Sequence, residues 1–254
     1  MKTFKLTLGL AAAFALTVSG CGLLGDEPAK VLAESPRETL LKAVPDENTE
    51  AYAFDVKGAV QPMSGMLDAP KKTTQFKITH SEDGITLSMS ALLIEDRSWM
   101  RVALTGAPGY PALPKKWMPI DPKKIKDPDD VPTGYTDELD PGYADLIIRS
   151  SEEVRVTSPD HYAGTTDLTA STEAEIVEDA TLTALGEKAK AVPFEAVVGP
   201  EGHLSILLVR IPAAGKSKAV NYRVTYAGYG RTTTPTAPAD TAKPTEAVYD
   251  LLNS

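Results

Sequence analysis

Hydrophobic residues recur at every second position along much of the chain. The stretch "AVNYRVTYAGYG" shows this best, because Val220, Tyr222 and Val224 alternate with polar or charged neighbours. A period of two gives a strand one apolar and one polar face, which is typical of an antiparallel sheet covered on one side. The same alternation predicts strands within residues 52–60, 75–79, 85–93, 100–104, 154–156 and 162–170, and a hairpin over 192–211 that turns at "GPEG".

Three segments carry helical signals instead. In "SPRETLLKAVPDE", Ser35 and Glu38 have the spacing of a capping box, which predicts a short helix that Pro45 ends. A second helix is predicted over residues 171–191, where acidic residues fill the first turns as the helix dipole prefers. The stretch "TEAVYDLL" near the C-terminus predicts a last helical turn.

Residues 106–142 break the alternation because they contain eight prolines. Proline fixes φ and removes a backbone donor, so this segment is predicted as a long loop with at most a short edge strand around Trp117 and Met118. A loop of that length inside a compact domain is usually functional or disordered.

Together these elements predict an α+β fold. A large antiparallel sheet of roughly nine or more strands would curl into a half-barrel, and the few helices would lie on its concave face. We expect a single domain over residues 35–254, with a Thr- and Pro-rich tail from about residue 231. The space between sheet and helices is either a filled core or a ligand cavity, and the pattern leaves both open.

The N-terminus reads as a targeting segment. Residues 1–20 have a basic start, an apolar centre and a small-residue exit, which is typical of a signal peptide. The exit before Cys21, "VSGC", resembles the bacterial lipobox, and this resemblance implies that Cys21 carries a diacylglyceryl thioether. Two acyl chains hold a protein stably in a bilayer. Residues 21–34 would then be a flexible tether on the extracytoplasmic face of the cell membrane.

The net charge of the chain limits the classes of molecule that it is expected to bind. The chain has a net charge of −9, and removing residues 1–20, which hold two lysines and no acid, makes it −11. Such an acidic protein is a poor candidate for nucleic acid, whose binding depends on Lys and Arg neutralising phosphates. Cys21 is the only cysteine, so no disulfide within the chain is possible.

The order of these elements resembles the actinobacterial lipoprotein family of LppX, LprA, LprF and LprG, relatives of the LolA- and LolB-like lipoprotein-sorting proteins. The pieces that carry the likeness are "KKWMPIDP", "DHYAGTTDLT", "PFEAVVGPEGHLSILLVRI" and "YRVTYAGYG". The resemblance implies a half-barrel closed by helices around an apolar cavity, in which some members carry acylated glycolipids or other envelope lipids. The stretch "YAGYG" departs from the family pattern at Ala227 and Gly228.

We therefore expect a membrane-anchored envelope lipoprotein that binds an apolar or lipid ligand, with an interaction or scaffold protein as the alternative. In the scaffold case the concave side would be a filled core without a ligand. Strand parity selects the following cavity-lining candidates: Phe54, Val56, Phe76, Ile78, Leu87, Met89, Phe194, Val220, Tyr222 and Val224.

Catalytic and metal-binding patterns are missing from the sequence, which predicts no enzymatic activity, cofactor or metal. The three histidines, His80, His161 and His203, have no metal-ligating neighbours at useful spacing. Asp127, Asp129 and Asp130 lack the spacing of a calcium loop. Five loop lysines could contact lipid head groups or simply balance nearby acids in solvent, and the charge pattern favours the second; they are Lys115, Lys116, Lys123, Lys124 and Lys126.

Overall fold

The computed structural model describes residues 34–127, 131–172 and 176–253. These residues form one antiparallel sheet of 11 strands, open at both edges, which confirms the predicted fold class. The strands are β1 (Tyr52–Lys57), β2 (Met63–Asp68), β3 (Thr73–Glu82), β4 (Ile85–Ile94), β5 (Arg97–Thr105), β6 (Met118–Pro119), β7 (Ser151–Ser158), β8 (His161–Thr166), β9 (Val192–Val198), β10 (Leu204–Ile211) and β11 (Val220–Ala227).

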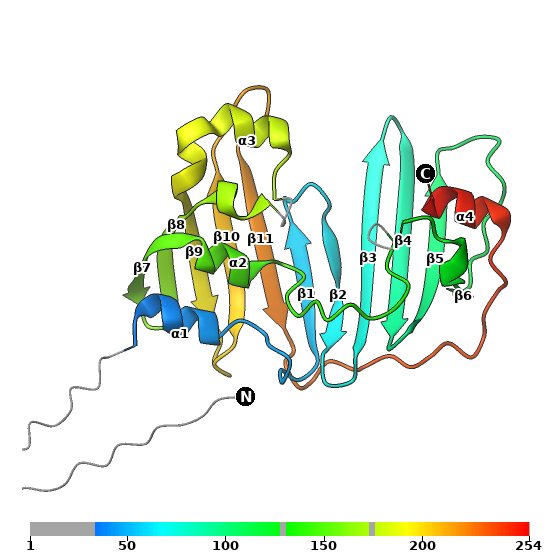
Figure 1. Cartoon of the computed structure of the whole chain (residues 1–254), viewed down its shortest axis with the longest axis horizontal. Coiled ribbons are helices and arrows are strands. Elements are labelled where there is room, and N and C mark those ends of the chain that lie inside the picture. The colour runs from blue at the N-terminus through cyan, green and yellow to red at the C-terminus, as the bar shows by residue number, and fades with distance from the viewer. Residues whose placement is uncertain (1–33, 128–130, 173–175, 254) are drawn as a thin grey trace, which may run out of the picture. The chain divides into compact units, whose positions relative to one another are not determined.

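The sheet consists of two meanders that meet at its centre. Its strand order is β6-β5-β4-β3-β2-β1-β11-β10-β9-β8-β7. The chain runs from the central strand β1 out to β6, crosses to β7 at the opposite edge, and returns strand by strand until β11 pairs with β1 (Figure 1). The crossing segment between β6 and β7 contains most of the predicted Pro-rich loop, so this loop lies across the sheet.

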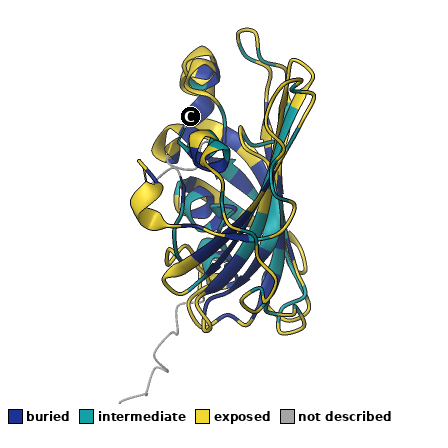
Figure 2. Ribbon diagram, turned by 90° about the vertical axis from the view of Figure 1, so that its right-hand side faces the viewer, coloured by how far each residue is buried: buried dark blue, intermediate teal, exposed yellow. Residues whose placement is uncertain are grey.

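Within the described residues, four short α-helices lie on the concave side of the curled sheet (Figure 2). They are α1 (Pro36–Lys42), α2 (Ala144–Arg149), α3 (Asp179–Leu185) and α4 (Glu246–Leu252). The predicted capping box of α1 is present: the Ser35 hydroxyl accepts from the Glu38 amide, and the Glu38 carboxylate accepts from the Ser35 amide at 2.9 Å. Among the described residues there are also 3₁₀ turns, η1 (Pro122–Lys124), η2 (Leu168–Ala170) and η4 (Gly186–Ala191).

The pattern missed two elements. Strand β2, "MSGMLD", alternates poorly because the polar Ser64 and the small Gly65 follow its first residue. At Gly65 a side chain would collide with the backbone of Gln75 in β3, so the gap in the pattern is a steric requirement. Helix α2 has only six residues and follows Tyr143 in the left-handed conformation, with no side-chain cap to signal its start.

The prediction of one helix over residues 171–191 is wrong in extent. Helix α3 begins only at Asp179 and ends at Leu185, and Gly186 caps it with a φ of 53°, a conformation that glycine adopts easily. Thr181 and Leu185 form its buried face. Residues 162–170 likewise divide into β8 and the turn η2, because Asp167 caps η2 through the amide of Thr169 at 2.8 Å.

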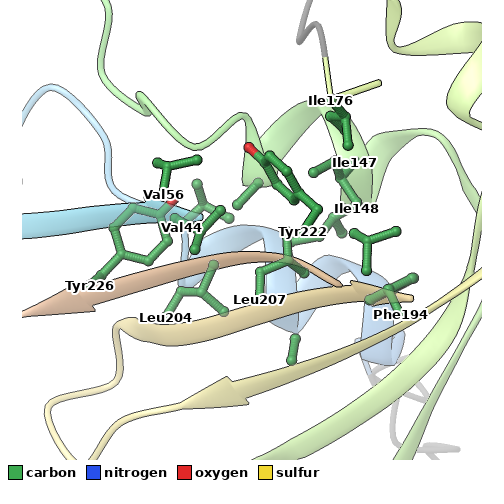
Figure 3. Packing of buried hydrophobic residues seen from close by; sticks show 14 of the residues in the cluster. Val44, Val56, Ile147, Ile148, Ile176, Phe194, Leu204, Leu207, Tyr222 and Tyr226 are labelled. Atoms are coloured by element: carbon green, nitrogen blue, oxygen red, sulfur yellow. The ribbon is translucent and has the colours of Figure 1, made fainter. Parts of the chain in front are cut away.

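Two separate apolar clusters cover the concave face. The large core joins strands β1 and β8–β11 to α1, α2 and α3. Figure 3 shows Tyr222 and Phe194 near Ile147 and Ile148, with Val56 beside Val44 and Tyr226. The edge core joins β4–β6 to α4 and the loop after β6. Its buried members are Ala91, Leu93, Met100, Val102, Met118, Ile120, Ile125, Val131, Val248, Tyr249 and Leu252.

The Thr- and Pro-rich tail, residues 231–245, connects β2 to the β6 edge of the first meander. Thr234 hydrogen-bonds Asp68 in the β2–β3 turn, Asp240 pairs with Lys116 at 2.7 Å, and Ala242 donates to the Trp117 carbonyl at 2.9 Å. Between these contacts lies a row of buried residues on the face opposite the helices, formed by Met66, Leu92 and Trp99. We attribute their burial to the tail, so the prediction of a sheet covered on one side only is wrong at this row.

Candidate functional site

An apolar groove lies on the concave face where the two clusters leave the sheet uncovered. Its volume is about 410 Å³. The floor is formed by strands β1–β4, and the roof by residues 132–143 of the crossing segment. Its lining residues are Phe54, Gln61, Met63, Leu67, Thr74, Phe76, Ile78, Met89, Leu93, Pro132, Thr136, Glu138, Pro141 and Tyr143.

Three tyrosines of the sheet hold the end of the roof in place. The hydroxyl of Tyr52 donates to the Leu139 carbonyl, that of Tyr222 to the Gly142 carbonyl at 2.8 Å, and that of Tyr226 to the Asp140 carboxylate. The approach is close, because a side chain on Gly142 would overlap the side chain of Val224. The roof therefore has a fixed height above β1 and β11 on the side of the large core.

Asp140 is the buried polar centre of this anchor. Besides the Tyr226 hydroxyl, its carboxylate accepts from the amides of Gly142 at 3.2 Å and Asp145 at 2.9 Å. Burial raises the pKa of Asp140 to about 6, and these three donors lower it only in part. Burial and the nearby Asp140 carboxylate also raise the pKa of Tyr226 well above its ordinary value, so this tyrosine acts as a neutral donor.

Most of the residues that line the groove are apolar. Gln61, Thr74, Thr136, Glu138 and the Tyr143 hydroxyl supply polar side-chain atoms, and Glu138 is the only carboxylate among the lining residues. Lys and Arg are missing from the lining residues, so the described groove has no cation that could pair with an acidic head group. Such a site can hold an apolar chain by burial, at about 25 cal/mol per Å² of apolar surface removed from water.

The ten predicted lining residues are divided between the groove and its surroundings. Phe54, Phe76, Ile78 and Met89 line the groove. Leu87 is half-buried beside the edge core, and Val220 packs against the large core. The remaining four, Val56, Phe194, Tyr222 and Val224, are buried within the large core, where α1, α2 and their neighbours cover them.

Sequence reasoning missed the groove's roof and part of its floor. Met63 and Leu67 lie on the unpredicted strand β2, and the roof residues lie in a segment that has no periodicity. The prolines at 132 and 141 were the available signal, because a long ordered Pro-rich segment in a compact domain must lie against something. Nothing in the pattern indicated that it crosses the sheet.

The loop lysines differ in their surroundings. Lys116 pairs with Asp240 at 2.7 Å and Lys124 with Glu246 at 3.0 Å, so acids of the C-terminal segment balance them. Lys124 also lies 4.8 Å from the centre of the Tyr249 ring. Lys123 and Lys126 are exposed. Their backbone amides donate hydrogen bonds to the side chains of Asp121 and Asn253, respectively. Lys115 lines a second cavity.

The other candidate residues remain dispersed. His80 and His161 are exposed, and His203 stacks on Tyr229 with ring centres 4.5 Å apart. Across the part of the chain that the structure describes, no three His, Cys, Asp or Glu residues gather as a metal site would require. Asp129 and Asp130 lie outside the described residues.

The predicted signal peptide (1–20), Cys21 and almost all of the tether also lie outside the described residues. Within the described ranges, no helix has both the length and the apolar character needed to cross a membrane. Compared with known proteins, the chain matches no family model, and a search of curated proteins found no match either.

Proposed function

We propose that this protein is a lipid-anchored lipoprotein of the cell envelope that binds an apolar or lipid ligand in the groove, without covalent chemistry. The groove itself carries this proposal, because it is an apolar space over β1–β4 that neither core fills. The chain buries large side chains tightly on both sides of it, so the uncovered stretch is not a general weakness of packing.

A groove-filling variant tests ligand binding. Met89 lies on the groove floor, and Met89→Trp should fill part of the space. Asn221→Trp is a matched control, because Asn221 is exposed on the opposite face of β11. With an uncharged, pyrene-labelled long-chain alcohol as the probe, we expect Met89→Trp to weaken binding at least tenfold and Asn221→Trp to leave it unchanged. Equal binding by both variants would place the probe elsewhere and contradict the proposal.

The membrane anchor requires its own test. We expect wild-type protein to incorporate labelled palmitate and to fractionate with membranes. Cys21→Ala should abolish the labelling and release the protein or leave an unprocessed precursor. A Cys21→Ala variant that labels and fractionates like the parent would rule out this anchor, while the groove proposal would stand.

A scaffold protein is the second candidate, and the filled parts of the concave face favour it. Four of the ten predicted lining residues are buried in the large core instead of facing an empty space. If the groove bound no apolar probe while partner proteins still co-purified with the protein from its membrane, the scaffold function would be favoured over ligand binding.

A further inference from the structure

A second cavity, of about 620 Å³, lies at the β5 edge of the sheet beside residues 107–115. Its lining includes three cations from three different segments: Lys77 of β3, Arg101 of β5 and Lys115 of the following loop. Ser90 of β4 lies between Lys77 and Arg101 in the strand register, and Ser88, two residues away on the same strand, also lines the cavity. Its lining residues include no Asp or Glu. We call this space the edge cavity.

The strand register places the two sheet cations on either side of one serine. Lys77 is paired with Ser90, and Ser90 is paired in turn with Arg101. Residues directly opposite each other in antiparallel strands project from the same face. Because neighbouring strands lie about 4.8 Å apart, the Lys77 and Arg101 backbones are separated by roughly 10 Å. An anion above Ser90 would therefore be within reach of both long side chains.

What the three cations share is a cavity whose lining residues include no acid to neutralise them. Lys77, Arg101 and Lys115 take part in none of the ion pairs between described residues, although the chain has 35 acidic residues against 26 basic ones. The adjacent Lys116, in contrast, is paired with Asp240. Like charges gathered on one sheet face are unfavourable without a counter-charge.

Arg101 is also held in position. Its guanidinium lies 4.2 Å from the centre of the Trp117 ring, an arrangement that orients the planar group and leaves its edge for hydrogen bonding. Residues 107–115, which line the same cavity, add apolar surface through Tyr110 and Leu113. The edge cavity thus joins a cationic wall to an apolar one.

We propose that the edge cavity binds a phosphate monoester whose remaining part is apolar. Arg and Lys donate charge-assisted hydrogen bonds to phosphate oxygens, and the serine hydroxyls can donate as well. The apolar wall would contact the organic part. This site goes beyond the groove and does not depend on it, because the groove's lining contains no Lys or Arg.

Isothermal titration with three probes tests the site: decyl phosphate below its micelle concentration, decanol and inorganic phosphate. The titrations use Met89→Trp protein, so that the groove contributes little. We expect decyl phosphate to bind at least tenfold more tightly than either of the other probes. If inorganic phosphate binds as tightly as decyl phosphate, the site takes free phosphate, and the proposed contact between the apolar wall and the organic part is wrong. If decanol binds as tightly as decyl phosphate, the proposed role of the cations in binding the phosphate is wrong.

Substitutions of the cations test whether they bind the phosphate group. Arg101→Ala with Lys77→Ala should weaken decyl phosphate binding at least tenfold, whereas Arg101→Lys should retain part of it. Lys188→Ala is the control, because Lys188 is an exposed lysine of η4 far along the chain. Circular dichroism verifies that the variants fold. Folded double-variant protein that binds decyl phosphate within twofold of the parent would overturn the proposal.

Discussion

The two halves of the sheet are covered in opposite ways. Strands β7–β11 are covered by α1, α2, α3 and the turns between them, and the large residues of β9–β11 that face this cover, such as Phe194, Leu207 and Tyr222, are almost fully buried. Strands β2–β6 depend on the loop after β6 and on α4, which the tail brings from the end of the chain (Figure 1). The groove lies between the large core, which α1, α2 and α3 cover, and the edge core, which α4 and the loop after β6 cover. The open binding space in this fold therefore follows from the gap between these two sets of covering elements.

The largest contrast should appear in core truncations on the two sides of this boundary. Phe194 is 1% exposed within the large core, so Phe194→Ala should lower the free energy of unfolding by about 3–5 kcal/mol. Ile78 lines the groove and is half-buried, so Ile78→Ala should cost about 1 kcal/mol or less. Denaturant titration measures both. Equal costs would mean that the groove wall is packed like the core.

A smaller loss of stability should follow from weakening the packing of α4 on the edge core. The Tyr249 ring is buried in the edge core, and its hydroxyl accepts from the Asp121 amide at 3.1 Å. Tyr249→Ala should cost about 2–3 kcal/mol, since a terminal helix can partly relax into the space. Amide exchange should quicken in β5 and β6 and stay unchanged in β9 and β10. Uniform quickening across the sheet would show that the halves unfold as one unit.

The smallest expected effect is a pH dependence of the stability, which comes from the buried carboxyl of Asp140 at the end of the groove's roof. The pKa of Asp140 is about 6 in the folded protein, against 3.8 for a free aspartate, so the folded state binds the proton more tightly. Stability should therefore rise as the pH falls, by about 1.4 kcal/mol between pH 7.5 and 5.0 from this group. Carboxyls whose pKa values are lowered, such as those of Asp46 and Asp68, lose their contribution only at lower pH.

Asp140→Asn provides the control for this dependence. Asparagine has one fewer acceptor for the amides of Gly142 and Asp145, so the overall stability should drop. The difference between the two pH values should nevertheless nearly vanish, because the titrating group is gone. A variant that keeps the full difference would assign it to another residue.

The sequence predicted the fold where the physical signal is local. Alternation along β1 and β11 and the capping box at Ser35 depend on neighbouring residues, and the structure confirms each of them. It also confirms β4 as a strand, although the burial of its residues does not alternate. Helix α2 and strand β2 escaped because tertiary contacts stabilise them: Thr166 donates to the Ile147 carbonyl of α2 at 2.7 Å, and Gly65 permits close approach of β3.

The candidate site was harder to predict for the same reason. Strand parity places Phe76 and Tyr222 on the same concave face, but it does not say which of them a distant segment covers. Tyr222 lies under the end of the roof, to which its hydroxyl is bonded, whereas Phe76 faces the groove. The difference is decided by where the crossing segment passes, and that path depends on long-range contacts such as Tyr226 with Asp140.

The most direct test of the central claim is native mass spectrometry of the protein released gently from its own membranes. The account predicts a bound species whose additional mass is that of an apolar or lipid molecule, and this species should be lost in Met89→Trp but kept in Asn221→Trp. Preparations that are repeatedly empty, and that take up no lipid when it is offered, would contradict it.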